Sequence, residues 1–354
     1  MDCIRVGKEE RYIKDFLDLA KKLYTKKDNM EDPESVRKLL TGEHPMSKYF
    51  TLDAYLIREG GRTVGRFAVT LYPDDDVCYL GFFECIDDKE TAQFLFASAE
   101  RIAKEKGCSR IEGPVDASFW IKYRLKINNF DRLPYTGEPY NKEYYYRLFL
   151  DNGYRVKEHY TSNAYRAIDD KYVNEKFEGR YREFLDHGYR IESPKIEDYE
   201  KILGDVYRMI TELYSDFPIY KHVSEEDFRE MFMSYKSIMN MSMTKIAYYK
   251  DRAVGFYISL PDYGNRVYHL NVPNILSVLK TRKHPERYVM LYMGVDAGHR
   301  GLGKAIVYSI MKELEANRLP SIGALARDGK VTQTYVIEEA TSIYEYVLLE
   351  HSLE

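Results

Sequence analysis

An internal repeat constrains the fold of this chain more than any other feature of its sequence. Arg62-Thr63-Val64-Gly65 opens an alternating apolar and polar segment that ends at Leu71-Tyr72-Pro73-Asp74. Arg252-Ala253-Val254-Gly255 opens a second one, 190 residues later, that ends at Leu260-Pro261-Asp262. A strand and a short turn precede each segment, so both copies are typical of a β-hairpin. The repeat predicts two copies of one fold within the 354 residues.

The order of the expected elements is the same around each hairpin. In the first half we expect a helix over 9–24, strands over 54–59, 64–71 and 77–86, a helix over 89–106 and a strand over 110–113. In the second half we expect helices over 196–214 and 225–235, strands over 245–249, 254–260 and 288–295, a helix over 302–317 and a strand over 321–326. This order predicts an α/β fold with two tandem domains, each a mixed, partly antiparallel sheet flanked by helices.

A charged segment with helical periodicity, residues 169–188, separates the two copies and is interpreted as a helical connector. The expected domains are therefore 1–168 and 189–354. The second copy also carries an insertion, residues 263–287, between its second and third strands. Its basic residues are Lys280, Arg282, Lys283, His284 and Arg287. They predict either a solvated face or a surface that contacts an acidic group of a ligand.

Composition narrows the class of protein. Lys+Arg 53 against Asp+Glu 57 gives a net charge of −4, which argues against a broadly basic nucleic-acid binder. No apolar run approaches the roughly 18 residues that cross a bilayer, and the first residues lack the apolar core of a signal peptide. We therefore expect a cytoplasmic protein that binds neither membrane nor nucleic acid. The four cysteines have no CxxC spacing, so no metal site is expected. The 34 tyrosines fit either β-strand preference or an aromatic-lined pocket.

The clearest indication of chemistry lies between the expected strand 288–295 and the expected helix 302–317. There the chain reads Val295-Asp296-Ala297-Gly298-His299-Arg300-Gly301-Leu302-Gly303-Lys304-Ala305. The first N–H groups of a helix have no backbone partners, and the helix dipole adds positive potential. Glycines let a phosphate approach the backbone closely, and Arg300 and Lys304 add charge. The segment therefore predicts a cradle for an anion.

Two common nucleotide-binding motifs do not match this segment. A Walker A loop requires Ser or Thr after its Gly-Lys pair, but Ala305 follows Gly303-Lys304. A dinucleotide-binding turn requires a third glycine where Ile306 stands. The position of the segment late in a mixed sheet also disfavours both.

Arg300-x-x-Gly303-x-Ala305 resembles the R/Q-x-x-G-x-G/A signature of the GCN5-related N-acetyltransferases, the GNAT superfamily. The resemblance covers about residues 190–350, and Ala297 stands where a proline is common. It implies that acetyl-CoA is the co-substrate and that backbone N–H groups of about Gly301, Leu302, Gly303, Lys304 and Ala305 hold its pyrophosphate. Arg300 and Lys304 add positive charge there. It also implies that the strand containing Met293 and Val295 pairs with the pantetheine arm.

The resemblance further implies an N-acetyltransferase that moves the acetyl group to a primary amine of a small molecule or peptide by direct attack. A backbone N–H at Met293 or Val295 would stabilise the oxyanion. Tyr335 would protonate the leaving thiolate, although a packing role is the alternative. Asp296, or Glu338, would take the amine proton directly or through water, unless these carboxylates are solvated surface. His299 is interpreted as a loop residue, and no metal is implied.

The first half resembles the same fold but lacks the glycine motif. Gly81-Phe82-Phe83-Glu84-Cys85-Ile86 leads into Asp87-Asp88, whose charges would repel phosphate. Together with 111–114 and 139–145, this segment resembles tandem-GNAT bacterial proteins of unassigned substrate. We interpret the first half as a degenerate copy. Two other functions stay open, a non-catalytic acyl-CoA-binding protein and a tRNA-dependent aminoacyl transferase, as does assembly into a homodimer.

Overall fold

The computed structural model of the protein describes residues 1–73 and 75–353; Asp74, which closes the first copy of the repeat, and Glu354 lie outside the described residues. The first half contains β1 (Asp2–Val6), α1 (Glu10–Leu23), α2 (Pro33–Thr41), β2 (Thr51–Glu59), β3 (Arg62–Leu71), β4 (Val77–Cys85), α3 (Lys89–Glu105) and β5 (Arg110–Gly113). After these come β6 (Val115–Asp116), β7 (Lys122–Tyr123), β8 (Leu125–Lys126), α4 (Tyr145–Asp151) and β9 (Arg155–Tyr165).

The second half follows the same order. It contains α5 (Glu175–Asp186), β10 (Tyr189–Glu192), α6 (Tyr199–Leu213), α7 (Glu225–Met233), β11 (Lys245–Tyr249), β12 (Arg252–Pro261), α8 (Val272–Lys283), β13 (Tyr288–Val295), α9 (Leu302–Asn317), β14 (Ser321–Arg327) and β15 (Ser342–Ser352). Helix α8 lies within the predicted insertion, and α5 lies within the segment expected as a connector. The predicted α/β class, a mixed sheet flanked by helices, is confirmed.

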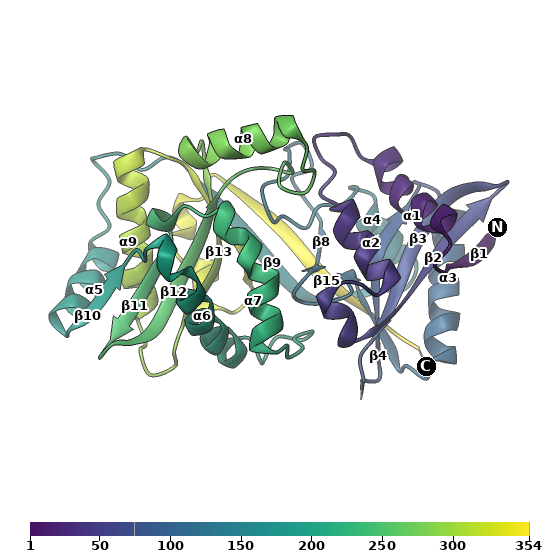
Figure 1. Ribbon diagram of the computed structural model, residues 1–354, viewed down its shortest axis with the longest axis horizontal. Coiled ribbons are helices and arrows are strands. Elements are labelled where there is room, and N and C mark those ends of the chain that lie inside the picture. Colours follow the sequence, from purple (N-terminus) through teal and green to yellow (C-terminus); the bar gives the residue numbers. More distant parts are fainter. Residues whose placement is uncertain (74, 354) are drawn as a thin grey trace.

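One sheet runs through both halves, because the two halves exchange their last strands. Its strand order is β1-β2-β3-β4-β5-β15-β9-β14-β13-β12-β11-β10. Strand β9 is the last strand of the first half but pairs with β14 of the second, while the C-terminal β15 pairs with β5 and with β9. In Figure 1, β15 (yellow) crosses between the halves and brings the C-terminus next to α3. The sheet is therefore continuous across the expected domain boundary.

Alternating residues of the central strands place helices on both faces of the sheet. Leu56 and Phe256 belong to one buried cluster together with residues of α1, α2, α6 and α7. Their neighbours Ile57 and Tyr257 point the other way, the former to the cluster of α3 and α4 and the latter to that of α5 and α9. The helix layer with α1, α2, α6 and α7 is thus shared between the halves, which gives the molecule a common core.

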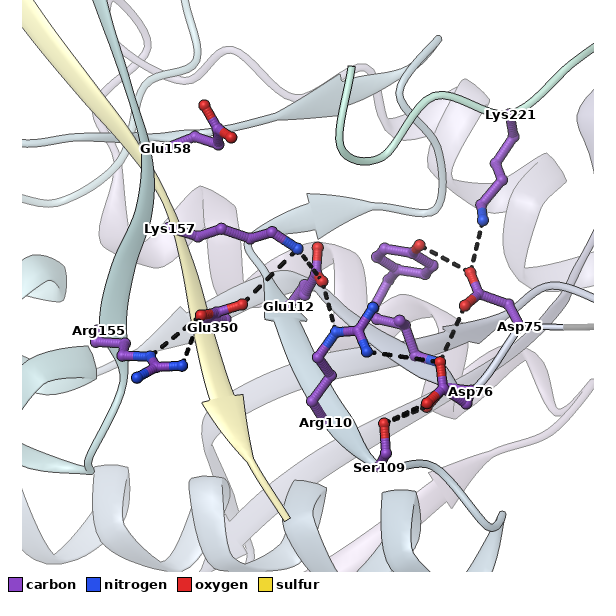
Figure 2. A network of polar contacts seen from close by, with 12 residues as sticks. Asp75, Asp76, Ser109, Arg110, Glu112, Arg155, Lys157, Glu158, Lys221 and Glu350 are labelled. Atoms are coloured by element: carbon purple, nitrogen blue, oxygen red, sulfur yellow. Dashed lines mark hydrogen bonds and ion pairs between the residues drawn. The ribbon is translucent and has the colours of Figure 1, made fainter. Parts of the chain in front are cut away.

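Ion pairs tie the exchanged strands to their hosts. Figure 2 shows Lys157 of β9 between Glu112 of β5, which it contacts closely, and Glu350 of β15, at 3.7 Å. Lys221 of the second half binds Asp75 of the first at 2.6 Å. These contacts explain how polar residues are accommodated where the two halves meet. Across residues 1–73 and 75–353, no helix is long and apolar enough to cross a membrane.

Candidate functional site

The site begins where two neighbouring parallel strands separate. Strands β13 and β14 pair only over Tyr288–Met290 and Ser321–Gly323. Beyond that point β13 continues to Val295 on β12, and β14 continues on β9 with a bulge between Gly323 and Ala326. In the described part of the chain no strand pairs with the β14-facing edge of β13 after Met290. Backbone groups of Leu291–Val295 therefore border an opening in the sheet.

A cavity of about 980 Å³ fills this opening. It is lined by β13 from Met290 onward, by the start of α9, by β14 and by the segment 330–336, which contains Tyr335. Further parts of the wall come from α6, α7 and β12 and from an aromatic segment of the first half that includes Phe119 and Trp120. A cavity of this size is at the upper end of the range for small-molecule sites, roughly 300–1,000 Å³.

Helix α9 points an uncapped N-terminus at the cavity. Gly301 is its N-cap residue, with φ of 95°, a left-handed conformation that glycine adopts without strain. Within the described chain no side chain caps this terminus. Leu302 and Ala305 are fully buried and do not line the cavity, and the Leu302 N–H donates to the His299 carbonyl at 3.1 Å. The Lys304 N–H donates to the Gly301 carbonyl at 3.2 Å, whereas the N–H groups of Gly301 and Gly303 have no backbone partner in the described chain. The first turn thus offers these two donors and the positive end of the helix dipole.

Gly303, Met293 and Tyr335 meet at this first turn. A Cβ on Gly303 would lie 2.8 Å from the Tyr335 hydroxyl oxygen and 2.9 Å from the Met293 methyl group. The Tyr335 ring packs edge-on against Phe177 of α5 at 5.5 Å, and burial raises the pKa of its phenol. The structure therefore brings together three of the residues singled out in the sequence. Any side chain larger than hydrogen at position 303 would displace the other two.

Cations from α5 join those of the motif. Lys304 lies near Lys176 and Arg180, and burial together with these two charges lowers the pKa of its ammonium group. The Arg180 guanidinium carbon would lie 3.9 Å from a Cβ on Gly301, although Arg180 also pairs with Glu183 at 2.7 Å. Arg300 is exposed and lines the cavity. Like charges held this close are unfavourable by themselves, so the cluster suits a polyanionic ligand.

The sequence did not point to the contribution of α5. Its charged, helical periodicity indicates an exposed helix, which is why residues 169–188 read as a connector. Periodicity does not reveal which neighbour a helix packs against, and α5 packs on α9 through residues such as Phe177. Lys176 and Arg180 lie at the site only because of that packing.

Asp296 and His299 are held by other residues of the second half. The Asp296 carboxylate pairs through Oδ2 with Arg208 of α6 at 3.2 Å and with Arg252 at 3.8 Å. Its Oδ1 is buried and has no hydrogen-bond partner in the described chain. His299 binds the Tyr189 hydroxyl through Nδ1 at 2.7 Å and packs against the Tyr189 and Tyr249 rings. Asp296 lines the cavity, whereas Glu338 is exposed and does not.

The corresponding opening in the first half is filled by its own side chains. Strands β4 and β5 separate after Tyr79, just as β13 and β14 do after Met290. Here, however, the Phe82 N–H donates to the Asp116 carboxylate at 2.5 Å, and the Cys85 N–H donates to the Tyr145 hydroxyl at 3.1 Å. A Cβ on Gly81 would lie 1.9 Å from the Val115 carbonyl oxygen.

The helix that follows this opening is also capped. The Asp88 side chain accepts from the Thr91 N–H at 2.8 Å at the start of α3. A carboxylate therefore occupies the N-terminus of α3, whereas no side chain of the described residues caps the N-terminus of α9. In the described residues, no group of three or more His, Cys, Asp or Glu side chains is placed to hold a metal ion.

No protein-family model matches the chain. It is 26% identical to Protein YghO of Escherichia coli K12 over 159 residues, which is 43% of this chain and 41% of that protein. The match thus spans about two fifths of the relative.

Solved structures match over the whole chain, at low identity. A protein described as a tandem GNAT protein of the clavulanic acid biosynthesis pathway aligns with 100% of this chain and 98% of its own, with a TM-score of 0.54 and 11% identity. A glucosamine N-acetyltransferase region of a fungal multi-domain enzyme aligns with 99% of this chain, 38% of its own, with a TM-score of 0.53 and 12% identity. An Enterococcus faecalis probable N-acyltransferase aligns with 100% of this chain, 73% of its own, with a TM-score of 0.50 and 12% identity. The chain therefore has the fold of the GCN5-related N-acetyltransferase (GNAT) superfamily, with two copies in tandem.

Proposed function

We propose that the protein is an N-acetyltransferase that moves an acetyl group from acetyl-CoA to a primary amine of its acceptor by direct attack. One observation carries the proposal. The open edge of β13, the uncapped N-terminus of α9 and a cluster of cations border the same cavity. A donor with a phosphate group at one end and an amide-bearing arm at the other matches these features: the phosphate fits the α9 terminus and the cations, and the arm fits the open edge of β13.

The residues at α9 fit the phosphate part of such a donor. Within the segment Gly301–Ala305, the backbone N–H groups of Gly301 and Gly303 would hold the pyrophosphate, and the absent side chain at Gly303 makes room for Tyr335 and Met293 beside it. Arg300 and Lys304, with Lys176 and Arg180 of α5, would balance its charge. The β13 edge around Met293 and Val295 would pair with the amides of the arm.

Acetyl-CoA, when bound, supplies the acetyl group as an activated thioester. The Met293 or Val295 N–H would stabilise negative charge on the carbonyl oxygen under attack. The Tyr335 phenol would donate a proton to the thiolate, and its raised pKa keeps it protonated. The unpartnered Oδ1 of Asp296 would accept the amine proton, while Arg208 holds the other carboxylate oxygen.

Release of CoA from acetyl-CoA, followed with a thiol reagent over a panel of primary amines, tests this function. The proposal predicts release that depends on an added amine. Binding of acetyl-CoA without release for any amine would favour the non-catalytic acyl-CoA-binding alternative. A protein that ignores acetyl-CoA but retards charged tRNA would favour the tRNA-dependent aminoacyl transferase.

A further inference from the structure

The first half contributes to the cavity a cation that pairs with no carboxylate of the described residues. Arg124 lies between β7 and β8 and lines the same cavity as β13 and α9. Its guanidinium carbon lies 3.8 Å from the ring centre of Tyr123 and 4.2 Å from that of Tyr160. One terminal nitrogen donates to the Tyr123 hydroxyl. Its Nε is buried and has no hydrogen-bond partner in the described chain.

Two neighbouring cations of the same segment, in contrast, are paired with carboxylates. Lys122 pairs with the Asp116 carboxylate at 2.8 Å, and Lys126 pairs with the Glu138 carboxylate at 2.7 Å. No carboxylate of the described residues lies within ion-pair distance of Arg124. Desolvating a charge without a partner is costly, so a cation in this state is a natural receptor for an anion.

The backbone conformation of Arg124 is also strained. Its φ is 92°, in the left-handed region that favours glycine, and the conformation is held by a hydrogen bond from its N–H to the Pro114 carbonyl at 3.1 Å. Non-glycine residues in such conformations cost on the order of 1–3 kcal/mol and cluster at functional sites. The conformation keeps the side chain between the two tyrosine rings.

A chain of ring contacts connects Arg124 to the backbone at which transfer would occur. Tyr123 stacks on Phe119 at 5.3 Å, and Phe119 packs against Tyr214 at 6.1 Å. The charge of Arg124 also opposes the rise that burial causes in the pKa of Tyr214. Tyr214 donates to the Met293 carbonyl at 3.2 Å. An anion on Arg124 would therefore place the rest of its molecule along the β13 edge. The walls of this part of the cavity are aromatic: Phe119, Trp120, Tyr123 and Phe217.

We propose that Arg124 binds a carboxylate of the acceptor, so that the acceptor is an amine that also carries a carboxylate on an apolar or aromatic body. The planar guanidinium is partly exposed at the cavity, and its terminal nitrogens would donate to the carboxylate oxygens. The inference rests on the proposed function, because it names the substrate class for that reaction. It also gives the degenerate half a role, which is to recognise the acceptor for the other half.

Trp120 provides a test that does not require turnover. It is the only tryptophan in the chain, and it lines this cavity. Its fluorescence, excited where tyrosine does not absorb, would be titrated with matched amino acids and their amides, aliphatic and aromatic, in the presence of CoA. We expect the acids to bind roughly tenfold to hundredfold more tightly than the amides, since one charge-assisted pair has that value.

Two variants of Arg124 and one control complete the test. Arg124→Gln should remove the preference for acids, and Arg124→Lys should keep part of it. Arg155→Gln removes an exposed arginine that pairs with Glu350 at 3.0 Å, and it should behave as wild type. CD spectra and melting curves confirm that each variant is folded.

The outcomes separate the two proposals. Three results would overturn the acceptor inference and leave the donor site intact. The first is equal binding of acids and amides, and the second is failure of every acid to bind a protein that binds acetyl-CoA. The third is an unchanged preference for acids in folded Arg124→Gln or Arg124→Lys. Failure to bind acetyl-CoA would overturn the proposed function itself.

Discussion

Individual residues at the site have properties that only the fold reveals. The glycine motif was visible in the sequence because its spacing is local, and Gly303 lies at the cavity as that motif predicts. The contact of Tyr335 with Gly303 depends on a long-range approach. Arg124 left no signature in the sequence, because an arginine between a tyrosine and a leucine looks like any strand residue. Catalytic roles for Tyr335 and Asp296 stay predictions.

Tyr335→Phe tests the proposed acid. The change removes only the hydroxyl and keeps the ring on Phe177. We expect kcat to fall by about 10²–10⁴ with little change in acetyl-CoA affinity, because proton donation to the thiolate is lost. Steady-state kinetics and a calorimetric titration measure the two effects. Tyr181→Phe, on a ring that packs against Tyr308, is the matched control. A folded Tyr335→Phe protein with unchanged kcat would contradict the assignment.

Glu84 should make stability depend on pH. Burial raises the pKa of its carboxyl to about 7 from 4.5, against the opposing effects of Arg66 and Tyr145. The folded state thus holds this proton more tightly than the unfolded state. The stability from this group is therefore complete below about pH 4.5 and is lost as pH rises through about 7.

The Glu84→Gln variant replaces the carboxyl with an amide, which does not titrate in this pH range. Relative to wild type, its free energy of unfolding should rise by up to about 3 kcal/mol as the pH increases across this window. Urea unfolding at several pH values measures the difference. Parallel stability curves for the two proteins would show that the carboxyl is not perturbed in this way.

At the scale of elements, the sequence predicted the bounds of several individual strands and helices. Strands β11 and β13 and helix α9 have the predicted bounds, since alternation and helical spacing report how one segment is buried. Periodicity carries no information on partners. The exchange of β9 and β15 and the packing of α5 on α9 therefore could not be predicted. The cations of α5 became part of the candidate site only through that packing.

Lys176→Ala combined with Arg180→Ala tests the role of α5. We expect acetyl-CoA affinity to fall by roughly tenfold at low salt and by less at high salt, because the lost attraction is electrostatic. Titration calorimetry at two ionic strengths measures both effects. Arg182→Ala removes an exposed arginine of the same helix that pairs with Glu178, and it should leave affinity unchanged. Equal losses in the two proteins would mean that general charge, rather than position, is responsible.

At the scale of the whole molecule, the two halves depend on each other. Strand β15 of the second half pairs with β5 of the first, and β9 of the first half pairs with β14 of the second, so neither half forms its part of the sheet alone. The shared cluster of α1, α2, α6 and α7 joins them on one face. A half whose own opening is filled therefore still contributes to the rest of the molecule. It supplies a strand, a core and one wall of the cavity.

Expression of fragments 1–168 and 169–354 tests this dependence. Each fragment alone should fail to give a cooperative thermal transition, because its sheet ends at an unpaired strand edge. Produced together, the fragments should purify as a complex with such a transition. A monomeric fragment that melts cooperatively by itself would show that the halves fold as independent domains.

The central claim is that one donor site lies at the start of α9, and calorimetric titration of acetyl-CoA tests it most directly. Wild type should bind one molecule per chain, since the first half fills its own opening. Gly303→Glu should weaken binding by about a hundredfold or more, by placing bulk and negative charge in the cradle. Gly298→Glu introduces the same charge where a Cβ would meet no atom of the described chain within 4 Å, and it should bind nearly as wild type. Arg300→Ala with Lys304→Ala replaces Gly303→Glu if that variant does not fold. No binding to folded wild type, or equal binding to folded Gly303→Glu, would contradict the account.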